Sequence, residues 1–115
     1  MLGGKFQIGM SGGGSLPLKL DKFFNSIGIR LVEGYGLTET APICCIRNAK
    51  RPILGTIGKI MPYCQAKVVH RNGIECKPGE KGVLYIKGPN VMKGYYKQPE
   101  LTAEVISEGE WFNTG

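Results

Sequence analysis

The sequence predicts an α/β fold in which a βαβ piece of an open parallel sheet is followed by an antiparallel sheet or small β-barrel. Two observations carry this prediction. Before Pro42, strand-like and helix-like apolar patterns alternate, with a glycine-rich loop after the first strand-like run. After Pro42 the chain consists mainly of short apolar runs separated by turn residues, which is typical of antiparallel strands.

The first half of the chain opens with an alternating run at residues 5–10, which predicts a strand. A helix is expected next, because apolar residues recur at helical spacing, namely at Leu16, Leu20, Phe23, Phe24 and Ile27. Ser15 can cap its start, Pro17 suits its first turn, and Gly28 can end it. Residues 29–32 predict a second, buried strand.

Two loops of this unit should meet at one edge of the sheet. Strands joined by a single helix lie parallel with a right-handed crossover, so the loop after each strand emerges at the same carboxyl edge. These loops are residues 11–15 and residues 33–40. Because ligands of open α/β sheets bind at that edge, the two loops form one candidate site.

The second half of the chain predicts a hairpin and further short strands. The expected strands are residues 65–70, 74–76, 82–87 and 111–113. Asn72-Gly73 between two apolar runs is a strong hairpin signal, and residues 77–80 form a second turn. Residues 99–106 predict a short helix with Pro99 in its first turn.

Composition allows one modest hydrophobic core, since 42% of the 115 residues are apolar. The net charge is +6, but the basic residues are scattered, and we interpret the one local cluster, Arg47, Lys50 and Arg51, as solvated surface. If the excess positive charge serves binding, we expect anionic phosphates or a membrane surface as its targets. The sequence shows no signal peptide or transmembrane span, so we expect a cytoplasmic location, with peripheral membrane contact as an alternative.

Cysteine and histidine usage argues against a metal centre built from these residues. The four cysteines, Cys44, Cys45, Cys64 and Cys76, lack CxxC spacing, and His70 lies in a strand-like run without a second ligand nearby. Cys44 and Cys45 lie in an apolar stretch, which predicts reduced core thiols of a cytosolic protein.

Neither glycine-rich loop matches a standard phosphate-binding motif. Residues 9–15 have the spacing of GxxxxGK[ST], but Ser15 stands where the lysine is required. Residues 34–39 begin like a dinucleotide fingerprint, but Glu39 occupies the third glycine position and would repel a pyrophosphate unless a cation intervened. An ordinary turn with a capping threonine is the alternative explanation of this second loop.

The second loop nevertheless offers groups that suit a nucleotide. Tyr35 presents a ring face to a base, and Gly34 and Gly36 permit close approach of the backbone. Thr38 can hydrogen-bond a phosphate oxygen. Glu39 can hold Mg²⁺, which commonly takes one or two protein carboxylates and completes its shell with water and substrate phosphates.

Five ordered segments of the chain have the character of family motifs: SGGGSL (11–16), GYGLTET (34–40), GTIGK (55–59), GVLYIKGPNVMKGYY (82–96) and WFNTG (111–115). These segments resemble motifs of the adenylate-forming superfamily of acyl-CoA synthetases, luciferases and adenylation domains. The resemblance covers essentially the whole chain. It implies that residues 1–42 are the carboxyl-edge βαβ part of an AMP-binding α/β subdomain, and that residues 43–115 form an incomplete, distorted antiparallel β-barrel.

The resemblance also implies roles for individual residues. Those implied to bind the nucleotide lie in both loops: Gly12, Gly13, Gly14, Glu33, Gly34, Tyr35, Gly36 and Thr38. The glycine loop would border the adenine and the acyl carboxylate, and the start of the second loop would contact the adenine. Thr38 would meet the phosphate and Glu39 the magnesium, which makes this pair the catalytic candidates.

The implied reaction uses ATP, Mg²⁺ and coenzyme A: a carboxylate attacks the α-phosphate of ATP to give an acyl adenylate, and the thiol of coenzyme A then displaces AMP. IRLVEGYGLTETAP, residues 29–42, looks most like the long-chain fatty acyl-CoA synthetases. An aryl or amino-acid adenylating enzyme is the first alternative. A non-catalytic nucleotide- or RNA-binding module is the second, although only Tyr85 near Lys81 and Lys87 hints at stacking on RNA.

Several parts of the family's active site are missing from this sequence. The lysine-bearing phosphate loop, the ribose-binding aspartate and the adenylation lysine have no counterpart in the 115 residues. We therefore expect the chain to be an internal fragment of a ligase, with small-molecule substrates as its partners, and to be inactive alone.

Overall fold

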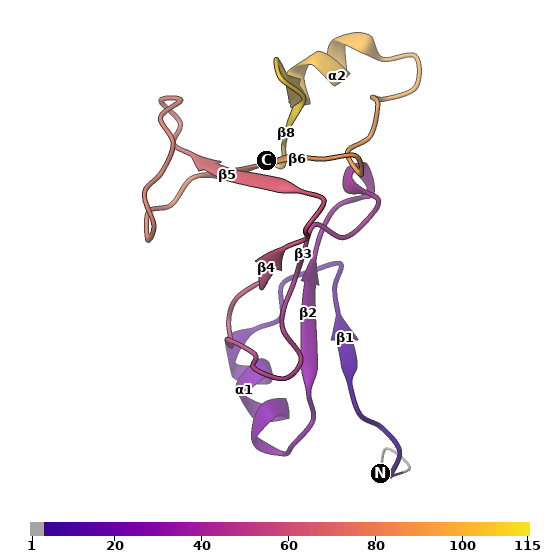
Figure 1. Cartoon of the computed structure of the whole chain (residues 1–115), viewed down its shortest axis with the longest axis vertical. Coiled ribbons are helices and arrows are strands. Elements are labelled where there is room, and N and C mark those ends of the chain that lie inside the picture. Colours follow the sequence, from indigo (N-terminus) through magenta and orange to yellow (C-terminus); the bar gives the residue numbers. More distant parts are fainter. Residues whose placement is uncertain (1–3) are drawn as a thin grey trace. The chain divides into compact units, whose positions relative to one another are not determined.

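The computed structural model describes residues 4–115, which form two compact units (Figure 1). The first unit contains the chain up to Gly36 together with Ile43–Ile60. The second contains Leu37–Pro42 and Met61–Gly115. The motif GYGLTET is therefore shared between the units, since its first three residues belong to the first unit and its last four to the second.

The first unit is a four-stranded sheet with one helix. Its elements are β1 (Gly9–Ser11), α1 (Leu18–Ser26), β2 (Leu31–Tyr35), β3 (Cys45–Ile46) and β4 (Lys59–Ile60). The strand order is β1-β2-β3-β4, in which β1 and β2 are parallel and the remaining pairs are antiparallel. The predicted βαβ unit is confirmed, with α1 as the crossover between the parallel strands (Figure 1).

Helix α1 begins later than the sequence indicated. Pro17 is its N-cap and no side chain caps it, so the predicted role of Ser15 is wrong. The ring of Pro17 fixes its φ near −60°, which suits a residue at the start of a helix. The helix ends as predicted, because Gly28 adopts a φ of +79°, a conformation that glycine reaches without steric cost.

The interior of the first unit combines apolar and charged side chains. Val32, Cys44 and Cys45 are buried, as are three charged residues, Asp21, Glu33 and Arg47. The interpretation of Arg47 as solvated surface is therefore wrong: only 3% of this residue is exposed, because two carboxylates surround its guanidinium. Its sequence neighbours Lys50 and Arg51 are exposed, as expected.

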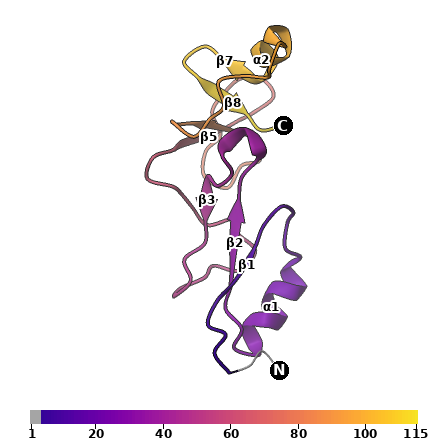
Figure 2. The same cartoon turned by 90° about the vertical axis from the view of Figure 1, so that its right-hand side faces the viewer.

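The second unit is an antiparallel sheet with a short helix. Its elements are the 3₁₀ turn η1 (Thr38–Thr40), β5 (Gln65–Val69), β6 (Val83–Lys87), α2 (Pro99–Val105), β7 (Ile106–Ser107) and β8 (Trp111–Asn113). Figure 2 shows β7 and β8 next to α2. The strand order is β5-β6-β8-β7. The predicted α/β class with an antiparallel second part is confirmed, although these strands form an open sheet and do not close into a barrel within residues 4–115.

The predicted hairpin after β5 is formed. The amide of His70 donates to the carbonyl of Ile74 at 2.8 Å, and Gly73 turns the chain with a φ of +85°. Residues 74–76 make one isolated bridge, Val69 to Glu75, instead of the expected strand. Ile86 and Phe112, on neighbouring strands, are buried and form the centre of this sheet.

None of the helices among the described residues is long and apolar enough to span a membrane.

Candidate nucleotide site

The glycine loop, Gly12 to Gly14, leaves the carboxyl end of β1 and is exposed. The parallel register pairs Ser11 with Glu33, so this loop lies at the same sheet edge as the end of β2. A Cβ on Gly12 would lie 3.5 Å from the carbonyl oxygen of Gly34, whereas a Cβ on Gly13 or Gly14 would meet nothing within 4 Å. The prediction that the two loops share one edge is confirmed for their first-unit residues.

Glu33, one of the residues implied to contact adenine, uses its side chain inside the protein. Its Oε1 accepts a hydrogen bond from the backbone N–H of Leu16 at 3.0 Å, and its Oε2 accepts one from Nη2 of Arg47. The residue is only 5% exposed. Its carboxylate thus holds the segment that leads into α1 against β2, and it keeps the glycine loop at the sheet edge.

A buried charge network lies in the interior of the first unit. Nη1 of Arg47 donates to both carboxylate oxygens of Asp21, at 2.9 and 2.7 Å, and Nη2 donates to Glu33. The carbonyl of Thr56 accepts from Nε and Nη2 of the same arginine, at 3.0 and 2.7 Å. The amide of Gly55 completes the shell by donating to Asp21 at 3.0 Å. This network ties α1, β2, β3 and the 55–56 turn together.

Sequence reasoning missed this network because its members are far apart in the chain. Arg47 lies 26 positions from Asp21 and 14 from Glu33. One signal was available: Asp21 is three residues before Phe24, and therefore on the same helix face as an apolar residue. A carboxylate on that face needs a buried cationic partner or it would not stay charged.

Gly34 and Tyr35 belong to β2 itself, and Gly36 follows directly. The carbonyl of Tyr35 accepts a hydrogen bond from the amide of Cys44 at 2.9 Å, which fixes the backbone of this tyrosine against β3. A Cβ on Gly34 would lie 3.8 Å from the carbonyl oxygen of Cys45, an ordinary contact. The strand pairing therefore sets the position of the Tyr35 backbone, while its half-buried side chain remains partly accessible.

Thr38 and Glu39 lie in η1, in the second unit. The hydroxyl of Tyr95 donates to Oε1 of Glu39 at 2.9 Å, and the amide of Met92 donates to the Glu39 carbonyl at 2.8 Å. Within residues 4–115 the other carboxylate oxygen, Oε2, makes no hydrogen bond. The contact raises the pKa of Tyr95, mainly through the hydrogen bond to Glu39, and further through desolvation and the negative charge of that carboxylate.

A capping threonine does shape this turn, but it is Thr40. Its buried hydroxyl accepts from the amide of Leu37 at 2.9 Å, and its carbonyl accepts from the side-chain amide of Asn90 at 2.7 Å. Thr38, by contrast, is exposed. The turn thus satisfies its own backbone through Thr40 and leaves the Thr38 hydroxyl accessible to a ligand.

The donor set of η1 fits partial coordination of Mg²⁺. One oxygen of Glu39 is oriented by Tyr95 and the other is open, and the exposed hydroxyl of Thr38 is one residue away. Mg²⁺ needs near-octahedral oxygen ligands and usually retains water and substrate phosphates. Glu39 would therefore supply one ligand, and the nucleotide and water would supply the others.

A family model described as "AMP-binding enzyme" matches residues 1–96. The chain belongs to the AMP-binding enzyme family. The chain is 49% identical over 111 residues to a chloroplastic long-chain-fatty-acid–[acyl-carrier-protein] ligase of Arabidopsis thaliana, with 95% of this chain and 15% of the relative covered. It is 39% identical over 113 residues to the long-chain-fatty-acid–CoA ligase of Salmonella typhimurium, with 95% and 20% covered.

The fold of the family is also found in solved structures. O-succinylbenzoate coenzyme A synthetase from Bacillus subtilis, in complex with AMP, matches with a TM-score of 0.81 and 33% identity, covering 94% of this chain and 22% of that one. The resemblance drawn from the five motifs is confirmed. The chain spans only about a fifth or less of the length of these relatives.

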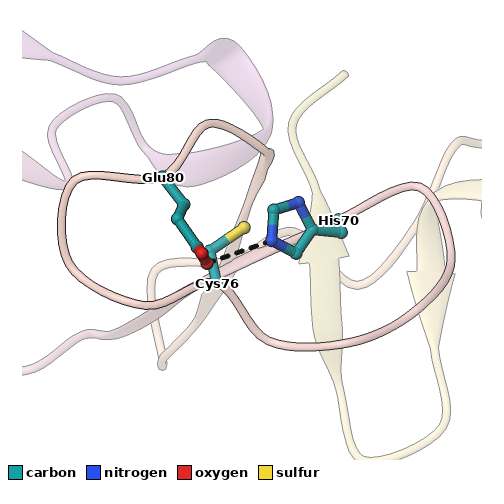
Figure 3. Close-up of side chains that lie close together, drawn as sticks. All are labelled: His70, Cys76 and Glu80. Atoms are coloured by element: carbon teal, nitrogen blue, oxygen red, sulfur yellow. Dashed lines mark hydrogen bonds and ion pairs between the residues drawn. The ribbon is translucent and has the colours of Figure 1, made fainter.

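A second cluster of side chains lies outside these loops. His70, which the sequence placed without a second ligand nearby, has its Nε2 3.1 Å from Oε2 of Glu80, and Cys76 lies beside both (Figure 3). The pKa of Glu80 is lowered, first by the backbone N–H of Lys77 and then by His70. The pKa of the Cys76 thiol is raised by desolvation and then by the negative charges of Glu80 and Glu75.

Proposed function

We propose that this chain supplies the adenine- and magnesium-binding part of a longer ATP-dependent long-chain fatty acid ligase. The observation that carries the proposal is the arrangement of η1, in which Tyr95 orients one carboxylate oxygen of Glu39 while the Thr38 hydroxyl stays exposed. These two residues occupy the family motif that the resemblance links to phosphate and magnesium. In the first unit, the exposure of the glycine loop supports an adenine-binding role for that loop.

The proposed chemistry begins with attack of a fatty acid carboxylate on the α-phosphate of ATP. An acyl adenylate forms and pyrophosphate leaves, after which a thiol displaces AMP to give the thioester. The hydroxyl of Thr38 would donate a hydrogen bond to a phosphate oxygen. Glu39 would hold a Mg²⁺ ion, whose charge would neutralise that of the phosphates. Donors aimed at developing charge typically contribute about 3 kcal/mol each to such a step.

The acyl substrate and the acceptor thiol are the finer parts of the proposal. Both relatives named above are long-chain fatty acid ligases, which supports a long-chain acid. Their acceptors differ, since one is an acyl-carrier-protein ligase and the other a CoA ligase. We assign coenzyme A from the sequence motifs, and the 49% identity to the acyl-carrier-protein ligase makes a carrier-protein thiol the second candidate.

Substrate assays would use the longer polypeptide that contains this chain. ATP–pyrophosphate exchange with long-chain, aryl and amino acids should be strong only with the long-chain acids, and thioester formation with each thiol identifies the acceptor. Exchange with aryl or amino acids alone would overturn the assignment to the fatty acid branch. The isolated 115-residue chain should form no acyl adenylate, and detectable adenylate from it would contradict its proposed role as one part of a larger site.

The role of Glu39 has its own test in that polypeptide. Glu39→Gln keeps the size of the side chain but removes its charge, so we expect the adenylation rate to fall by about 100-fold. ATP affinity should change much less, because the cation helps most as charge develops. Glu104→Gln, an exposed acid on α2, is the matched control and should leave the rate unchanged. An unchanged adenylation rate in Glu39→Gln would show that Glu39 does not hold the catalytic cation.

A further inference from the structure

The cluster of His70, Cys76 and Glu80 brings three different donor atoms together on two consecutive turns of the second unit. An imidazole nitrogen, the Sγ atom and a carboxylate oxygen all lie within 4.8 Å of one another. Figure 3 shows the three side chains converging, with the carboxylate of Glu80 pointing to the ring of His70 and the thiol of Cys76 beside them. The three residues lie within positions 70 to 80, so two consecutive turns bring them together.

The backbone that carries these side chains is well fixed. The amide of Cys76 donates to the carbonyl of Val68 at 2.7 Å, which holds Cys76 alongside β5. The amide of Lys77 donates to Oε2 of Glu80 at 2.7 Å, so the carboxylate is drawn over its own turn. The donors are therefore positioned by hydrogen bonds that do not depend on a ligand.

Gly82 makes room for the thiol. A Cβ at this position would lie 2.6 Å from Sγ of Cys76 and 2.5 Å from the carbonyl oxygen of Val69, distances that no side chain tolerates. Only glycine allows β6 to begin beside Cys76 in this way. The chain thus accommodates the sulfur atom at the centre of the cluster through a specific close approach.

Zinc takes each of the three donor types present here, namely an imidazole nitrogen, a thiolate sulfur and a carboxylate oxygen. Tetrahedral zinc with bonds of about 2.0–2.3 Å separates its ligand atoms by roughly 3.5 Å, and Nε2 and Oε2 already lie 3.1 Å apart. Calcium and magnesium prefer all-oxygen shells, so the thiol and imidazole disfavour them. One thiolate and one carboxylate would balance the charge of Zn²⁺, and the partial exposure of His70 and Glu80 leaves a fourth position for water.

We propose that His70, Cys76 and Glu80 bind a zinc ion, with water as the fourth ligand. When the zinc–sulfur bond forms, the thiol of Cys76 releases its proton to solvent, and the ring nitrogen of His70 and the carboxylate of Glu80 each donate a lone pair to the metal. The bound ion would tie the turn at residues 70–74 to the turn at residues 77–80. The site is independent of the nucleotide site, because it uses none of that site's residues.

The test measures metal binding by the complete 115-residue chain under reducing conditions. Competition with a chromophoric chelator gives the zinc dissociation constant, and cobalt(II) in place of zinc should give a thiolate-to-metal charge-transfer absorption. Cys76→Ser, His70→Gln and Glu80→Gln should each weaken zinc binding by at least about 100-fold, since they remove a direct ligand. Glu75→Gln, an exposed acid on the same hairpin, is the control and should retain wild-type affinity within a few-fold.

Two results would overturn the proposal. Equal zinc affinity in wild type and Cys76→Ser would show that Cys76 is not a zinc ligand. The other thiols, those of Cys44, Cys45 and Cys64, are buried in the folded chain, so they would not replace the thiol of Cys76. Absence of stoichiometric zinc binding would show that His70 and Glu80 form an ordinary surface ion pair. Circular dichroism of each variant ensures that folded chains are compared, and X-ray absorption of the zinc-loaded chain should show one sulfur ligand.

Discussion

The hydroxyl of Tyr95 donates a hydrogen bond to Oε1 of Glu39 at 2.9 Å, joining residues that are 56 positions apart. Tyr95 lies in the VMKGYY stretch and Glu39 in the GYGLTET motif, so two motifs of the family meet in one contact. The adjacent amide of Met92 holds the backbone of the same glutamate. Tyr95 is therefore a positioning residue for the proposed magnesium ligand.

This contact makes the pKa of Tyr95 a reporter of Glu39. The pKa is raised because the neutral phenol donates to the carboxylate and phenolate would be repelled by it. Stability from the contact is therefore complete below the unfolded tyrosine pKa of about 10, and it is lost as pH rises through the higher folded value. Glu39→Gln should lower the pKa of Tyr95, as measured by phenolate absorbance against a Tyr95→Phe reference. An unchanged titration would show that the hydrogen bond does not form in solution.

The buried guanidinium of Arg47 should be essential for stability. Arg47→Leu would leave the carboxylates of Asp21 and Glu33 without their cation, and both carboxylates are almost completely buried. Loss of one partner from a buried charge network typically costs about 3–5 kcal/mol. Urea denaturation of the wild type and of Arg47→Leu should show this loss in the free energy of unfolding.

Arg51 provides the matched control for this experiment. It carries the same charge four residues further along but is exposed, so Arg51→Leu should change the free energy of unfolding by less than about 0.5 kcal/mol. Similar effects of the two substitutions would mean that the guanidinium of Arg47 is solvated, as the sequence alone predicts.

The single tryptophan reports on the second sheet. Nζ of Lys67 lies 4.3 Å from the ring centroid of Trp111, a cation–π contact between β5 and β8. Lys67→Met keeps most of the stem but removes the charge, so it should change the tryptophan fluorescence and cost about 0.5–1 kcal/mol. Lys97→Met, which removes a charge placed over Tyr96, should leave the tryptophan emission unaltered. A Lys67→Met spectrum identical to wild type would contradict the contact.

Local patterns predicted the elements well. The βαβ unit, the Asn72-Gly73 hairpin, the helix at Pro99 and the last strand all follow from periodicity and turn chemistry within a few residues. The parallel pairing then followed from the handedness of the crossover, and it correctly placed the glycine loop beside the end of β2.

Contacts between distant residues could not be predicted in the same way. Nothing near Arg47 in the sequence indicates Asp21 or Glu33, and nothing near Tyr95 indicates Glu39. The strand-like run around His70 contains no second ligand, but the two turns that follow bring Cys76 and Glu80 back to it. Side-chain partners depend on how the chain folds back, and a single sequence records that only weakly.

Gly58, in the GTIGK segment, should tolerate no side chain. It adopts a φ of +85°, and a Cβ there would lie 2.1 Å from the carbonyl oxygen of Ile46 on β3. Gly58→Ala must therefore displace the backbone pairing of β3 with β4, and we expect a loss of at least about 3 kcal/mol. Gly14→Ala is the control: its Cβ would meet nothing within 4 Å, so the unfolding free energy should stay within about 0.5 kcal/mol of wild type. Equal urea midpoints for the two variants would show that β3 does not pass so close to Gly58.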